Sequence, residues 1–371
     1  MANYSLTEMA VKMHCPGNVV QLDDAGLPSI LVYIPKFKLS DVLTGGDDSV
    51  HPAFIVNGKE IPGFYYSKYE NVVHDGKAYS LPAENPTVWP TFNTARSNSE
   101  GKGYGWHMAT LAEWAAIALW CKKNGFLPYG NNNYGKDSRE SNYKAVPVSY
   151  KGDAVNMVAS GTGPVTWSHD GTPSGIWDMN GNVWEWQGGF RLVWGELQIL
   201  ANNNAADPDN PQNETSTCWK AISATDGSLV DPELSVSDTF SVGAAVSGRA
   251  VNPTVKLNLV NSVWNYSTTT TIRESNYSCP FASVICDANI SEAAKVLLRA
   301  LALLPDEGAS AEQYEGDIVY WRNDRPEIIA FRGGCSNNGQ ASGVFYIAGL
   351  YPRDFSSEYV GFRSAYIPDI E

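Results

Sequence analysis

The sequence predicts an α+β fold with many short strands, two main helices and long ordered loops. Three observations lead to this class. Only two segments combine an apolar helical pattern with clear start signals, several short apolar segments end at turn residues, and long stretches rich in Gly, Asn, Ser and Thr have no clear period. With 371 residues, 43% of them hydrophobic, the chain can bury a large core as one domain with an appendage or as two domains.

The first strands are expected near the N-terminus. Residues 30–34 are apolar and rich in β-branched side chains, Pro35 ends this run, and residues 36–39 continue the alternation, which predicts a strand pair. Residues 54–61 contain an Asn-Gly dipeptide between apolar arms, which predicts a hairpin. Residues 64–70 are expected to form two further strands.

Two helices follow from capping signals. The first predicted helix covers residues 111–121. Thr110 is its N-cap and forms a capping box with Glu113, so this is the clearest helix of the chain. Residues 292–304 form the second predicted helix, with Ser291 as its N-cap. Between and around them the chain is mostly strands and loops.

The remaining segments define the expected organisation. Residues 126–174 are predicted to form long ordered loops, and residues 200–280 resemble an insertion in which residues 228–271 hold several short strands. We expect an N-terminal appendage of strands over residues 1–50. The main domain is expected to cover residues 51–371.

The charge of the chain narrows the classes of partner. Its formal net charge is −14, and Lys and Arg do not cluster. Binding to nucleic acid or to an anionic membrane calls for a basic patch, so neither partner is expected, although acidity also has the ordinary effect of keeping a protein soluble. No window approaches the length of a membrane span, and the N-terminus lacks a signal-peptide pattern. We expect neither membrane insertion nor a signal peptide in this chain.

The cysteines and histidines do not form a recognisable metal motif. The six cysteines include no CxxC pair and no zinc pattern, and the five histidines are scattered. Buried free thiols are the ordinary interpretation, although Cys279 and Cys286 are close enough in sequence to bridge one loop. No catalytic metal is expected.

The last forty residues contain the most informative pattern. The tetrapeptide Phe-Arg-Gly-Gly at 331–334 opens a segment that Val-Gly-Phe-Arg at 360–363 closes. The interior is rich in small, amide and aromatic residues and has neither the alternation of a strand nor the period of a helix. This pattern predicts a rigid scaffold that displays an irregular binding face.

A second sequence motif lies upstream, and together with the C-terminal pattern it points to a known family. Residues 175–186, Gly-Ile-Trp-Asp-Met-Asn-Gly-Asn-Val-Trp-Glu-Trp, predict a tight turn at Gly181 that leads into a core strand. Together with the helix start at 110–114 and the C-terminal frame, this order resembles the formylglycine-generating-enzyme family, a branch of the C-type lectin fold. The resemblance covers about residues 52–366, with 195–285 poorly matched, and implies a C-type-lectin-like fold.

The catalytic members of that family oxidise a substrate cysteine with a pair of cysteines in the segment after the Arg-Gly-Gly motif. Here that segment carries Cys335 alone, and no cysteine follows it. A thiol-copper or dithiol mechanism needs two sulfur atoms at one centre. The resemblance therefore implies the fold without the oxidation chemistry, and we expect a protein that is not an enzyme.

The same segment resembles the variable region of diversity-generating retroelement proteins. Family templates begin with Arg-Gly-Gly-Ser-Trp-Asn-Asn-Gly, continue through Ala-Gly-Val-Phe and Ala-Arg, and close with Ile-Gly-Phe-Arg. This chain matches them in part at residues 332–339, 342–345, 352–353 and 360–363. The resemblance implies a ligand binder of a phage tail or a bacterial surface, an adhesin or receptor-binding protein, whose C-terminal codons are rewritten at adenines.

Most of the predicted binding residues lie where the segment departs from the templates. Rewriting the adenines of an Asn codon yields Tyr, Ser, Asp, Gly, Ala or Phe, which most of these positions carry; Gln340 and Glu358 do not fit. Aromatic residues with small polar neighbours suit recognition, as in antibody paratopes, so the four aromatic members are the predicted anchors, whereas Phe345 is expected in the core. The predicted ligand-binding residues are Ser336, Asn337, Gln340, Ala341, Tyr346, Ala348, Gly349, Tyr351, Asp354, Phe355, Ser357, Glu358 and Tyr359.

The turn at Gly181 also suggests a structural cation. The resemblance implies a calcium ion near this turn, and Asn180, Asn182 and Glu185 could supply oxygen ligands. Hydrogen bonds that stabilise the turn explain the same residues without a metal. No cofactor is expected to be required.

These observations favour a non-enzymatic protein that binds a receptor, protein or glycan, on a host or bacterial cell surface. It would act on a phage tail or a bacterial surface, where a homo-oligomer would multiply the affinity of each site. Two alternatives remain: an oxidoreductase of the formylglycine-generating type, which predicts a redox metal at Cys335, and a calcium-dependent carbohydrate-binding lectin.

Overall fold

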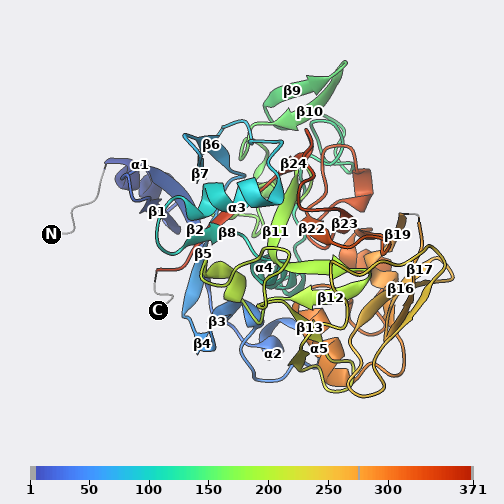
Figure 1. Ribbon diagram of the computed structural model, residues 1–371. Coiled ribbons are helices and arrows are strands. Elements are labelled where there is room, and N and C mark those ends of the chain that lie inside the picture. The colour runs from blue at the N-terminus through green and yellow to red at the C-terminus, as the bar shows by residue number, and fades with distance from the viewer. Residues whose placement is uncertain (1–5, 275, 369–371) are drawn as a thin grey trace.

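The computed structural model describes residues 6–274 and 276–368, and these form a mixed α+β structure (Figure 1). Many short strands lie in several sheets, and the helices are few, which confirms the predicted class. Among the described residues, no helix is long and apolar enough to cross a membrane. The helices are α1 Leu6–His14, α2 Leu39–Val42, α3 Phe92–Glu100, α4 Leu111–Lys123 and α5 Glu292–Ala300.

The smaller of the two main sheets joins the two ends of the chain. Its order is β1-β2-β5-β25-β8, and every neighbouring pair is antiparallel. The C-terminal strand β25 thus lies between β5 and β8, and the strands of the N-terminal fifty residues complete the same sheet. The bounds are β1 Asn18–Leu22, β2 Pro28–Pro35, β5 Gly63–Ser67, β8 Trp106–Met108 and β25 Ser364–Tyr366.

The larger sheet carries the C-terminal frame. Its main path is β19-β21-β23-β22-β11-β12-β16-β17-β20, with β13, β14 and β24 attached beside it. Strand β11 pairs with β22 and also with β24, so the sequence markers of the two halves meet here. The bounds are β11 Trp184–Val193, β12 Glu196–Ile199, β13 Lys220–Ile222, β14 Leu229–Val230, β16 Lys256–Val260, β17 Val263–Ser267, β19 Tyr277–Pro280, β20 Ile285–Cys286, β21 Ile318–Trp321, β22 Ile328–Arg332, β23 Ile347–Tyr351 and β24 Val360–Gly361.

Four separate two-stranded sheets complete the β structure. The predicted hairpin at Asn57 is confirmed: Asn57 and Gly58 have φ values of 50° and 76°, as a tight hairpin turn requires. The β9–β10 hairpin projects from the body of the molecule at the top of Figure 1. The bounds are β3 Ile55–Val56, β4 Lys59–Glu60, β6 Val72–His74, β7 Lys77–Tyr79, β9 Pro147–Lys151, β10 Ala154–Val158, β15 Ala245–Ser247 and β18 Thr269–Thr271.

The main core surrounds helix α4. The predicted capping box is present, since Thr110 Oγ1 accepts from the Glu113 N–H at 3.2 Å and Glu113 Oε2 accepts from the Thr110 N–H at 3.1 Å. Trp114 on this helix is fully buried, and its indole N–H donates to the Val344 carbonyl at 2.7 Å. The helix thereby connects the core directly to the C-terminal segment.

Four local predictions were wrong. Residues 36–39 are not a strand, because the chain leaves the sheet after β2 and enters α2 at Leu39. Residues 64–70 give one strand, β5, rather than two. Residues 126–174 are not loops throughout, because β9 and β10 form a hairpin within them. Helix α5 ends at Ala300, four residues early, because Ala302 takes a left-handed conformation (φ 48°) that ends the helix.

The cysteines are free thiols. All six lie in the described residues, and Cys279 and Cys286 are not bridged. The free-thiol interpretation is confirmed, with three of them buried.

Candidate functional site

The two arginines of the C-terminal frame are fully buried, and each is fixed by a different set of acceptors. Arg363 Nε lies 2.9 Å from both oxygens of Glu185, and its Nη2 donates to the Trp177 carbonyl at 2.6 Å. Burial raises the pKa of Glu185 to about 7, partly offset by Arg363. This ion pair ties the end of the segment to the motif at 175–186.

Arg332 has backbone acceptors instead of a carboxylate. Its Nη2 donates to the carbonyls of Leu301 and Ala302, both at 2.9 Å, just after the end of α5. Because burial penalises the charged form, the pKa of Arg332 falls to about 9. The arginine thus fastens the start of the segment to the end of α5.

The two glycines after Arg332 make a turn that other residues could not make. Gly333 and Gly334 have φ values of 86° and 79°, and a Cβ on Gly334 would lie 2.0 Å from Ser342 Oγ. That hydroxyl donates to the Gly333 carbonyl at 2.6 Å. The Gly-Gly pair therefore brings residue 342 against the frame.

A buried carboxyl shapes the middle of the segment. Asp317, 2% exposed, accepts from the Phe345 N–H at 2.7 Å, and a Cβ on Gly343 would lie 2.2 Å from its Oδ1. Burial raises the pKa of Asp317 to about 7. Phe345 is 1% exposed, which confirms the prediction that it belongs to the core.

Four predicted binding residues are buried, which corrects their assignment to the surface. Strand β23 lies between β21 and β22, and both of its faces are covered, since Ile347 packs in the main core and Ala348 in a second apolar cluster. Tyr346, predicted as an exposed anchor, is 0% exposed and packs against Phe331 and Phe362 in one apolar cluster. The buried residues are Ser336, Tyr346, Ala348 and Gly349.

The other nine predicted residues reach the surface. They come from two loops that flank β23, which we call the first loop (337–341) and the second loop (354–359), and from Tyr351 at the end of that strand. Asn337, Gln340 and Asp354 are exposed, and the half-buried members are Ala341, Tyr351, Phe355, Ser357, Glu358 and Tyr359.

Aromatic rings connect the second loop to the first. Tyr351 and Phe355 stack with centroids 3.7 Å apart and planes at 5°, and both rest on Phe331. Phe331 is 5.7 Å from Trp184, whose ring is 6.4 Å from Tyr359. We call these five residues the aromatic row. The Trp184 indole N–H also donates to Asn338 Oδ1 at 3.0 Å, beside the first loop.

Two residues that the sequence did not single out flank the second loop. Trp89 is 59% exposed, has φ 72°, and its N–H donates to the Ser357 carbonyl at 3.1 Å. Lys151, on the projecting β9–β10 hairpin, lies 2.7 Å from Glu358 and 2.9 Å from the Tyr359 hydroxyl. A tryptophan before a proline in a polar loop was the one signal that could have revealed Trp89.

Cys335 is packed beneath this surface. It is 1% exposed, and burial raises the pKa of its thiol to about 12. Its Sγ lies 3.3 Å from Asn337 Oδ1. A protonated, enclosed thiol is a poor nucleophile and a poor metal ligand.

The three candidate calcium ligands have protein partners. Both Glu185 oxygens pair with Arg363, Asn182 Oδ1 accepts from the Val158 N–H at 2.9 Å, and Asn180 Oδ1 accepts from Asn132 at 3.2 Å. Among the described residues, no group of three or more His, Cys, Asp or Glu side chains is placed to hold a metal ion. These contacts agree with turn-stabilising hydrogen bonds, and calcium stays a prediction.

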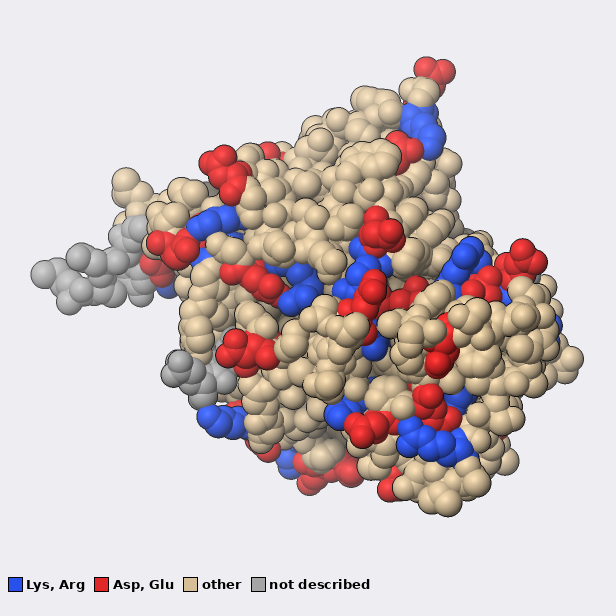
Figure 2. All heavy atoms as spheres, in the orientation of Figure 1, with Lys and Arg blue, Asp and Glu red and all other residues tan. Residues whose placement is uncertain are grey.

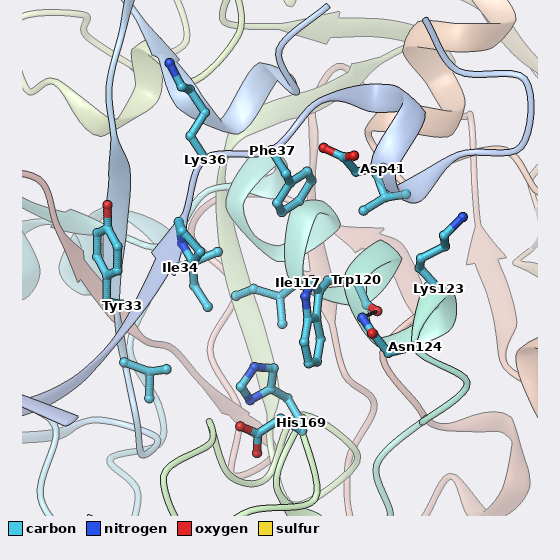
Figure 3. Close-up of a pocket in the computed structure, with 14 residues that line it drawn as sticks. Tyr33, Ile34, Lys36, Phe37, Asp41, Ile117, Trp120, Lys123, Asn124 and His169 are labelled. Carbon is cyan, nitrogen blue, oxygen red and sulfur yellow. Dashed lines mark hydrogen bonds between the residues drawn. The ribbon is translucent and has the colours of Figure 1, made fainter. Parts of the chain in front are cut away.

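A separate cavity of about 520 Å³ lies between β2 and α4, and no residue of the C-terminal segment lines it. Figure 3 shows Phe37, Ile117 and Trp120 around it, with His169 at its edge. His169 Nδ1 accepts from the Ile176 N–H at 2.8 Å, and burial lowers its pKa to about 4, so the ring is neutral at pH 7. No sequence pattern predicted this cavity.

The visible charge distribution is mixed. Figure 2 shows Lys and Arg interleaved with Asp and Glu, without a broad patch of one sign on the described part of this face.

Comparison with known proteins gives distant structural likeness alone. No protein-family model matches the chain, and no curated protein matches it. Among solved structures, the chain is similar to one described as the structure of PvdO from Pseudomonas aeruginosa, with 12% sequence identity over 94% of this chain and 97% of that chain and a TM-score of 0.36. A likeness at this level carries no argument about function.

Proposed function

We propose that this protein is a non-enzymatic binder with a C-type-lectin-like fold, and that the two loops and the partly exposed rings of the aromatic row form its ligand-binding face, with the buried Phe331 beneath them. The main observation behind the proposal is that the C-terminal segment divides into a buried frame and loops that reach the surface. Two buried arginines and a buried strand hold the frame, while nine predicted binding residues reach the surface around it.

The chemistry of the face suits recognition of a cell-surface protein or glycan. Tyr351 and Phe355 offer a large, pre-stacked area, and Asn337, Gln340 and Asp354 offer donors and acceptors at its edges. Rigid aromatic groups lose little conformational entropy on binding, and amide groups adapt to varied partners. The enclosed Cys335 thiol supports binding over an oxidation of the formylglycine-generating type.

Diversification is the second part of the proposal. Residues of the two loops can change with little effect on packing, whereas Ser336, Tyr346, Ala348 and Gly349 are constrained by burial. If the segment is rewritten, substitutions among isolates are expected to concentrate in residues 337–341 and 354–359 and at Tyr351. Sequencing the gene from many isolates tests this, and an identical segment in all of them would contradict it.

A binding experiment tests the face itself. Fluorescently labelled protein is incubated with a panel of intact bacterial strains, and bound fluorescence is measured by flow cytometry. The triple variant Tyr351→Ala, Phe355→Ala, Tyr359→Ala is expected to lose at least about tenfold in apparent affinity, because aromatic anchors dominate such interfaces. Trp120→Phe, in the separate cavity, is the control and should bind normally; equal loss in both variants would contradict the assignment.

A further inference from the structure

A thiol and a lysine amine meet at the other end of the molecule, where the N-terminal segment packs on the small sheet. Lys68 Nζ lies 3.3 Å from Cys15 Sγ, 2.5 Å from Asn18 Oδ1 and 2.6 Å from the Pro173 carbonyl. Cys15 follows α1 and is half-exposed, whereas Lys68, after β5, is 1% exposed. A small molecule can therefore reach the sulfur atom, while the amine approaches it from the protein side.

The surroundings of the amine act on its pKa in two directions. Burial lowers the pKa of Lys68, whereas the contact with Cys15 and the charge of Asp170 raise it. Its two oxygen partners are neutral, so no carboxylate binds the amine directly. A neutral amine has a lone pair that can attack sulfur, which an ammonium ion lacks.

We propose that Cys15 and Lys68 are a modification site at which hydrogen peroxide joins the two side chains as a sulfenamide. The sulfur of Cys15 first attacks one peroxide oxygen: the O–O bond breaks, an S–O bond forms, and one water molecule leaves. Sulfur is oxidised by two electrons to a sulfenic acid and the peroxide is reduced. The Lys68 nitrogen then attacks sulfur, the S–N bond forms, the S–O bond breaks, and a second water leaves with one amine proton.

The link would fasten the N-terminal segment to the frame. The backbone of Lys68 already contacts the frame, because its carbonyl accepts from Arg363 Nη1 at 3.2 Å. A covalent bond between residues 15 and 68 would restrict the unfolded chain across this loop. The expected consequence is a higher Tm after oxidation that dithiothreitol reverses.

Mass spectrometry tests the proposal on the full chain. After treatment with hydrogen peroxide, a peptide pair joined at Cys15 and Lys68 is expected at the summed mass of the two peptides less two hydrogen atoms. Cys218, also half-buried, has no lysine amine within hydrogen-bond distance among the described residues and is the internal control. Cys15→Ser should abolish the link. Lys68→Arg should leave a sulfenic acid at residue 15, which dimedone traps.

If Lys68→Arg does not fold, an experiment on the wild-type protein alone tests the same link. Dimedone added together with peroxide should reduce the yield of the link, because it competes with Lys68 for the same sulfenic acid. Three results would overturn the proposal: a stable, dimedone-reactive Cys15 without a link, a link that retains oxygen, or oxidation of Cys15 no faster than that of Cys218.

Discussion

The frame and the loops of the C-terminal segment occupy one short stretch of chain but obey different physical constraints. Arg332, Arg363 and Tyr346 are fully buried, and each contacts groups far away in the sequence. Gln340 and Asp354, a few residues away, are exposed. The difference shows that composition alone does not identify a binding residue, because a tyrosine at 346 supports the core while a tyrosine at 351 reaches solvent.

The largest expected effect comes from breaking the frame. Arg363→Ala should lower the free energy of unfolding by about 3–5 kcal/mol, because it leaves the Glu185 carboxylate buried without its partner. Urea denaturation measures this. Arg96→Ala is the control: its pair with Glu100 is partly exposed, so a loss under about 1 kcal/mol is expected. Similar losses in both variants would contradict the special role of the buried Arg363–Glu185 pair.

The second test compares the buried and exposed residues of the segment. Tyr346→Ala should cost about 3–5 kcal/mol, because it opens a cavity in the core, whereas Gln340→Ala should change stability by no more than about 0.5 kcal/mol. Tyr346→Phe should be nearly neutral, since the hydroxyl has no hydrogen-bond partner among the described residues. Calorimetry measures the stability of all three variants. If Tyr346→Ala did not lower stability, Tyr346 would lie at the surface, as the sequence predicted.

The third test uses the pH dependence of Asp317. Its pKa rises from 3.8 to about 7 on folding, so between these values the native state binds more protons than the unfolded state. Stability from this group therefore falls as pH rises from about 4 to 7, by at most about 1.4 kcal/mol per pH unit.

Two buried histidines change stability with pH in the opposite direction, so their contribution must be separated from that of Asp317. Burial lowers the pKa of His51 and of His169 to about 4, so their contribution is lost as pH falls below 6.5. The difference in unfolding free energy between wild type and Asp317→Asn isolates the carboxyl. A difference that does not change with pH would contradict the assignment.

The smallest effect concerns the aromatic row. A double-mutant cycle on Tyr351→Ala and Phe355→Ala should give a coupling of about 1 kcal/mol, because the rings stack directly. The pair Tyr351→Ala and Gln340→Ala serves as the comparison and should be additive. No coupling between the two aromatic residues would mean that the stack does not form in solution.

Local signals predicted several elements because local interactions dominate them. The capping box at Thr110 gives the start of α4, and the Asn-Gly pair at Asn57 gives the hairpin, since both depend on residues within one turn. The early end of α5 could not be predicted in this way. The carbonyls of Leu301 and Ala302, just after the helix, are bound by Arg332, which lies about thirty residues later.

The sequence by itself determined the fold class, the position of the frame and the residues that we propose for a binding face. Only the tertiary structure decided which of them reach solvent. Strand β23 pairs with β21 and β22 and packs on both faces, and Ala348, Gly349 and the preceding Tyr346 are buried there. Trp89 and Lys151 joined the second loop through contacts across more than two hundred residues. Burial is a property of the packed chain, so a local pattern cannot specify it.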